Sequence, residues 1–157
     1  FFYSLITYED IYEWKKDEWF NVILDDTNGV QLERVGTNKK YTVIFEGSYP
    51  ISVPIDECYK TDGMTNQGIA GCINLETKLL LRNINALHNH LTINANDELR
   101  AALTREKAAW NAYQKVRNEA VRSHYFQQQG SSQIIYNAED GLSQAKHRLD
   151  ALIRFFK

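Results

Sequence analysis

Hydrophobic and polar residues alternate in short runs through the first third of the chain. Three runs rich in β-branched and aromatic residues, at 19–24, 30–35 and 41–45, are separated by turn residues. Asn28-Gly29 lies between the first two runs, and this dipeptide is typical of a hairpin turn because both residues tolerate positive φ. The pattern predicts a small antiparallel β meander. The segment 47–54 contains both prolines of the chain, which remove backbone donors, so we expect a linker there.

From Met64 onward, hydrophobic residues recur every three or four positions, which is the period of an amphipathic helix. The spacing predicts one helix over about 65–91, although Gly68 and Gly71 weaken its first turns. A second helix begins after the turn at 94–97, and a third follows the Gln-, Gly- and Ser-rich segment 127–132. Three such helices with short connections pack as an antiparallel bundle.

These two periods together define the predicted fold class and domains. We expect an α+β protein, mostly α, in which an antiparallel three-helix bundle is preceded by a small antiparallel β meander. Residues 1–55 form a β-rich acidic segment, and residues 56–157 form the helical domain.

Charge is distributed unevenly between these parts. Residues 1–57 hold eleven acidic and five basic residues, for a net charge of −6, and the rest of the chain holds nine and thirteen, for a net charge of +4. The basic residues of the helical part are scattered singly among acids, as on a solvated helix face, so we expect no nucleic-acid partner. No apolar run approaches the ~18–20 residues needed to cross a bilayer, so we also expect no membrane span.

The two cysteines, Cys58 and Cys72, are spaced so that a disulfide between them is possible. In the loop-entropy model such a bond stabilises a fold by roughly 3 kcal/mol. The alternative is a pair of unconnected buried thiols in a cytosolic protein.

Catalytic and metal-binding motifs are missing from the sequence. It contains no HExxH, GxSxG, P-loop or dinucleotide fingerprint, and no nucleophile with a paired base. His88 and His90 face different sides of a helix, and His124 and His147 have no metal-site spacing, so ordinary surface histidines are the better interpretation. We therefore expect a protein that is not an enzyme and needs no cofactor or metal.

Two groups of residues are candidates for packing or partner binding. We expect Trp110, Tyr113, Leu103 and Leu149 to belong to the helical core, because aromatics three apart in a bundle usually pack inside. The acidic hairpin tip at Asp25, Asp26 and Asn28 could enter a cationic cleft of a basic partner. The alternative is a solvated turn chosen for its backbone geometry.

A family resemblance rests on the order of several motifs. A cysteine before a helix and a second in its first turns are followed by Leu99-Arg100, Ala109-Trp110-Asn111-Ala112-Tyr113 and Gly130-Ser131. In this order and spacing they resemble the LprI-type domain of bacterial lysozyme inhibitors, over about residues 56–157. Family members usually have Arg where this chain has Gln114, and Cys at about the position of Arg117, so the family's second disulfide cannot form here.

The resemblance implies a Cys58–Cys72 disulfide and a periplasmic or otherwise extracytoplasmic bacterial protein. It also implies a function: a proteinaceous inhibitor that binds and occludes a lysozyme-like cell-wall hydrolase. An alternative is an immunity protein that neutralises a toxic effector delivered into the periplasm by a competing bacterium, and a third is a purely structural envelope protein. The motifs identify no partner-binding residue.

Overall fold

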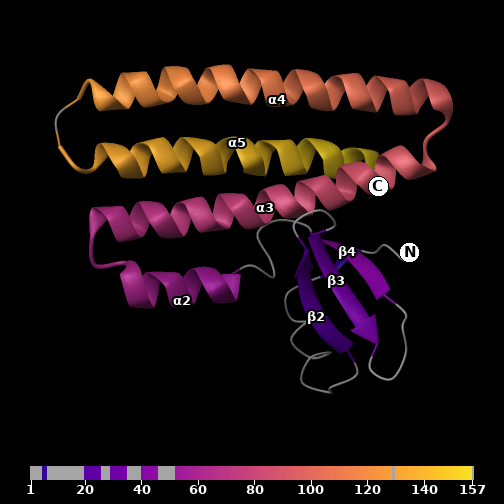
Figure 1. Ribbon diagram of the computed structural model, residues 1–157, viewed down its shortest axis with the longest axis horizontal. Helices are drawn as coiled ribbons and strands as arrows, with labels where there is room; N and C mark the ends of the chain where they lie inside the picture. The colour runs from indigo at the N-terminus through magenta and orange to yellow at the C-terminus, as the bar shows by residue number, and fades with distance from the viewer. Residues whose placement is uncertain are drawn as a thin grey trace.

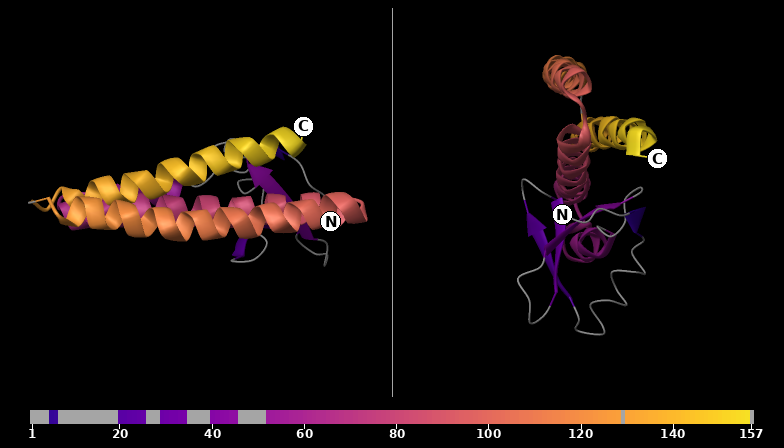
Figure 2. Two further views of the ribbon diagram at one scale, coloured as in Figure 1. Left: turned by 90° about the horizontal axis from the view of Figure 1, so that it is seen from above. Right: turned by 90° about the vertical axis from the view of Figure 1, so that its right-hand side faces the viewer.

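The computed structural model describes residues 5–6, 20–25, 29–34, 40–45, 52–128 and 130–156. Four helices make up most of this part: α2 (Ser52–Asp62), α3 (Asn66–Asn94), α4 (Asp97–Phe126) and α5 (Gln133–Phe156). The three long helices run side by side with alternating direction, and α2 lies along the N-terminal part of α3 (Figure 1). Seen from its end, the bundle has α4 as its outermost helix, on the side away from the strands (Figure 2).

The hydrophobic core lies mainly between α3 and α5. Leucines at helical spacing on both helices are almost fully buried: Leu80, Leu87, Leu149 and Leu152. Each buried leucine contributes roughly 1.5–3 kcal/mol relative to an exposed one. A smaller cluster of Ala70, Ile73 and Ala138 continues this contact toward the N-terminal end of α3. The amphipathic periodicity of the sequence therefore predicted the three long helices correctly, and α3 and α5 form the central pair.

The predicted fold class, an α+β protein with a three-helix bundle after an antiparallel meander, is wrong. The part whose packing the structure describes is helical: it has four helices, and no described core residue lies on a strand. The additional helix, α2, occupies part of the segment where the prolines predicted a linker. Pro54 is tolerated because it lies in the first turn of α2, where a backbone N–H has no partner within the helix.

The N-terminal strands differ from the predicted meander in their topology. The backbone of β1 (Leu5–Ile6), β2 (Phe20–Asp25), β3 (Gly29–Arg34) and β4 (Lys40–Phe45) forms a sheet in the order β1-β4-β3-β2. β2 and β3 are antiparallel where the alternation predicts a hairpin, but β1 is parallel to β4. The sheet is therefore mixed, since β1 adds a parallel pair to the antiparallel pairs β2–β3 and β3–β4.

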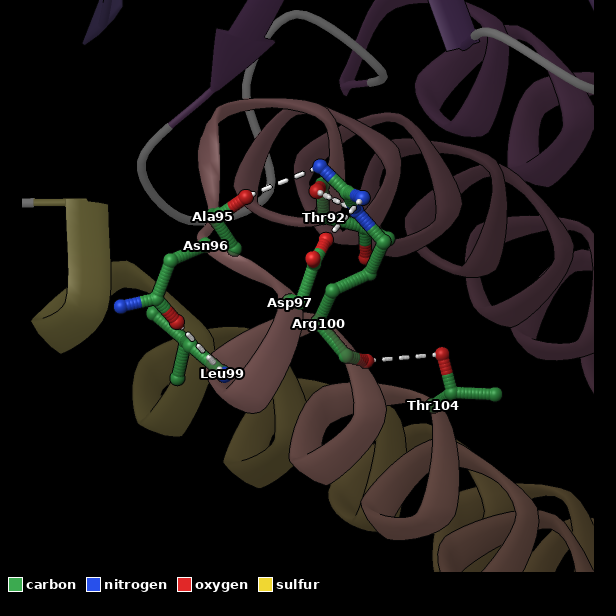
Figure 3. Close-up of polar contacts among 7 residues, drawn as sticks. All are labelled: Thr92, Ala95, Asn96, Asp97, Leu99, Arg100 and Thr104. Carbon is green, nitrogen blue, oxygen red and sulfur yellow. Dashed lines mark hydrogen bonds and ion pairs between the residues drawn. The ribbon is translucent and has the colours of Figure 1, made fainter.

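The corner between α3 and α4 is held by hydrogen bonds from Arg100 (Figure 3). Its guanidinium donates to the backbone carbonyls of Thr92 at 3.1 Å and Ala95 at 2.9 Å, and pairs with Asp97 at 3.1 Å. The side chain of Asn96 accepts from the Leu99 N–H at 2.8 Å and so caps α4. Arg100 thus satisfies carbonyls left open where α3 ends, which gives the Leu99-Arg100 pair a structural role.

No helix within the described ranges is both long and apolar enough to span a membrane.

Candidate functional site

The turns that connect α2 to α3 and α4 to α5 meet at one end of the bundle (Figure 1). The side-chain amide of Asn66 donates to the hydroxyl of Ser131 at 2.7 Å and ties the two turns together. We call this region the braced end and define it by Met64, Asn66, Phe126, Ser131 and Tyr136. No sequence pattern pairs Asn66 with Ser131, because 65 positions separate them.

A disulfide between Cys58 and Cys72 fixes the α2–α3 side of the braced end. The sulfur atoms are 2.07 Å apart, so the pairing predicted from the sequence is confirmed. Two hydrogen bonds add to it: the Gly63 N–H donates to the Tyr59 carbonyl at 2.9 Å, and the Thr65 hydroxyl accepts from the Gly68 N–H at 2.9 Å. The turn between α2 and α3 is therefore held by one disulfide and two hydrogen bonds.

The α4–α5 side is shaped by a single glycine. Gly130 has a φ of 112°, a left-handed conformation that residues with a Cβ rarely adopt. The Gly130-Ser131 motif thus has a backbone role: it turns the chain and presents Ser131 to Asn66.

Large apolar side chains are exposed at the braced end. Met64 is 91% exposed, Phe126 60% and Tyr136 47%, and the ring of Tyr136 stacks on that of Tyr125 with centroids 5.8 Å apart. Aromatic residues and methionine are enriched in the cores of protein interfaces. A rigid end with exposed apolar side chains is therefore a candidate protein-binding surface.

The acidic hairpin tip lies mostly beyond what the structure covers. Asp25 ends β2 and pairs with Gly29 in the register of the hairpin. Asp26 and Asn28 lie outside the described residues. The tip stays a prediction from the sequence.

Of the predicted core residues, two are buried and two are not. Leu103 and Leu149 are in the core, whereas Trp110 is only half-buried. The prediction for Tyr113 is wrong: this side chain is 52% exposed. The reason is that Leu103 is the only buried residue of α4, so Tyr113, further along the same helix, stays exposed to solvent.

Two arginine–carboxylate pairs hold α4 against α5 in place of an apolar seam. Arg148 is 7% exposed, and its guanidinium donates two hydrogen bonds to the Glu106 carboxylate, one of them, from Nη2 to Oε2, at 2.7 Å. The same guanidinium lies 5.0 Å from the ring centroid of Trp110. Arg117 pairs in the same way with Asp140, at 2.7 and 3.2 Å. The hydrogen bond from Arg148 lowers the pKa of Glu106, and the hydrogen bond that Arg117 donates to Asp140 raises the pKa of Arg117. Planar guanidinium forks favour this geometry.

His88 departs from the prediction of surface histidines. It is buried between α3 and α4, and its Nε2 lies 3.1 Å from the Leu103 carbonyl. Burial lowers the pKa of its imidazole, which is therefore neutral at physiological pH. Within the described residues, no three His, Cys, Asp or Glu side chains come together in a group that could hold a metal ion.

No protein-family model, curated protein or solved structure matches this chain.

Proposed function

We propose that the protein is an extracytoplasmic inhibitor that binds and occludes a lysozyme-like cell-wall hydrolase, with the braced end as its contact surface. The observation that carries the proposal is the exposure of Met64, Phe126 and Tyr136 at the braced end, where a disulfide fixes the α2–α3 turn and Asn66 ties that turn to Ser131. Fixing a loop before binding reduces the conformational entropy lost on association. More of the free energy from burying its apolar side chains then remains as binding affinity.

The family resemblance supports the activity, and the roles of its motifs fit that use of the fold. Arg100 closes the α3–α4 corner and Gly130 turns the chain between α4 and α5. Both motifs therefore maintain the helical framework, and the residues that contact a target are to be sought among other exposed side chains, those of the braced end first.

The disulfide supports the extracytoplasmic location. Disulfides persist in oxidising compartments such as the periplasm and are rare in the cytosol of mesophiles. A target in the cell wall would be reached from the same compartment.

The test begins by identifying the partner. Affinity-tagged protein is purified from periplasm, and the bound protein is identified by mass spectrometry and assayed for hydrolase activity with and without the inhibitor. We expect a cell-wall hydrolase that is inhibited at a one-to-one ratio. Recovery of a toxin encoded by a neighbouring strain would replace this proposal with the immunity function, and recovery of no enzyme would refute both.

Matched variants then locate the contact surface. Met64→Asp and Phe126→Asp place a charge at the braced end, and we expect each to weaken binding by about tenfold or more, the loss typical of a central interface residue. Val116→Asp is the control, because Val116 is an equally exposed apolar residue in the middle of α4. If the control weakens binding as much, or if only Asp25→Asn does so, the contact surface lies elsewhere.

A further inference from the structure

A groove of about 430 Å³ lies between α3, α4 and α5, away from the braced end. Four side-chain amides line it, those of Asn85, Asn111, Gln114 and Asn118, together with Lys107 and the ring of Trp110. Its volume is within the range of small-molecule sites, roughly 300–1,000 Å³.

The groove exists because α4 does not pack closely on the α3–α5 pair. The Arg148–Glu106 and Arg117–Asp140 ion pairs join α4 to α5, and Leu103 is the one buried residue of α4. A leucine seam would bring the helices together and close this space.

One lining group is left without a partner. The Nε2 of Gln114 is buried and makes no hydrogen bond within the described part of the chain. A buried donor without an acceptor is unfavourable, and native proteins normally pair such a group with a protein acceptor or with water. A single water occupies about 30 Å³, far less than the groove holds.

We infer that this groove is a binding site for a short saccharide. Each side-chain amide offers both donors and an acceptor, which matches the hydroxyl groups of a sugar. The Trp110 ring supplies an apolar surface for the C–H face of a sugar ring, and Lys107 adds a further donor. Lys107 is the only charged residue among the described lining residues, so the site lacks the paired charges expected for a phosphorylated ligand or a metal ion.

The experiment is a titration of the whole protein with cellobiose, maltose and chitobiose, followed by nuclear magnetic resonance of the side-chain amide and indole groups. We expect the signals of Asn111, Gln114 and Trp110 to shift and to saturate together at millimolar concentrations of at least one sugar. The signal of Asn74, an exposed asparagine of α3 outside the groove, should stay in place. No saturable shift with any of the three sugars would overturn the inference.

Two variants separate binding from folding. Gln114→Leu removes the unpartnered donor, and we expect sugar affinity to fall about threefold to tenfold, as for one lost hydrogen bond, while thermal stability is unchanged or higher. Asn118→Ala should also weaken binding, and Asn74→Ala should not. Retention of full affinity in both groove variants would show that the sugar binds at another surface. Met64→Asp should leave sugar binding intact, so that failure of the braced-end proposal can be told apart from failure of this one.

Discussion

Replacing Gly68 by alanine should destabilise the protein, although alanine favours helices. A Cβ at this position would lie 1.6 Å from the Asp62 carbonyl oxygen and 2.7 Å from its carbon. Both are backbone atoms that cannot rotate away, so the α2–α3 turn has to open. Opening it stretches the 2.9 Å hydrogen bond by which Thr65 caps α3.

The magnitude follows from three contributions. Losing a helix cap costs about 1 kcal/mol, and forcing a packed segment apart costs about 1–3 kcal/mol. The better helix propensity of alanine returns about 1 kcal/mol. We expect a net loss of about 2 kcal/mol for Gly68→Ala, which lowers Tm by roughly 4–8 °C in a chain of this size.

Gly71→Ala is the matched control, one turn further along the same helix. A Cβ there would meet nothing within 4 Å. This variant should gain up to about 1 kcal/mol, raising Tm by roughly 2–4 °C. Both variants are melted with the disulfide intact and followed by far-ultraviolet circular dichroism. If Gly68→Ala melts at or above the temperature of the unmodified protein, Asp62 does not approach Gly68 closely and the explanation of the turn is wrong.

Three further predictions concern covalent and ionisable groups. Replacing both Cys58 and Cys72 by serine should lower stability by about 3 kcal/mol, and non-reducing mass spectrometry of the native protein should find no free thiol. The hydrogen bond from Arg148 lowers the pKa of Glu106 below its ordinary 4.5, so the stability it contributes is present above that pH and is lost as pH falls through the lowered pKa. Urea unfolding at a series of pH values should therefore show an acid-side loss that Glu106→Gln reduces. Burial lowers the pKa of His88 below its ordinary 6.5, so the unfolded chain binds the proton more tightly than the folded chain. The free energy of unfolding should therefore fall as pH drops below 6.5. If this pH dependence is the same in His88→Gln, the explanation is wrong.

The sequence predicted the long helices because their evidence is local. Leu80, Leu87 and Leu149 recur at the period of a helix, and burial of that stripe needs no knowledge of the partner helix. The sequence analysis missed α2 because it took Pro54 as evidence against a helix. Proline is unfavourable only in the interior of a helix, and Pro54 lies in the first turn of α2. Gly68 and Gly71 look equivalent in sequence, and only the approach of Asp62 distinguishes them.

The candidate sites were harder to predict because they depend on distant pairs. Arg148 and Glu106 are 42 positions apart, and neither residue type nor spacing indicates that they meet. Trp110 follows the helical stripe and suggested a core position, but its side chain lines the groove, with the Arg148 guanidinium 5.0 Å from its ring centroid. A hydrophobic pattern shows which face of α4 points inward and does not show how closely that face approaches its neighbours.

The attachment of α4 to α5 is polar beside the groove. Arg117 of α4 makes its two-pronged contact with Asp140 of α5, so an ion pair joins the two helices. An ion pair between partly exposed groups is weaker than a disulfide and is screened by salt. The side-chain amides of Gln114 and Asn118, on the same helix as Arg117, line the groove. Helix α4 is thus joined to α5 by ion pairs while it buries a single residue, Leu103, and the polar groove lies along the same helix.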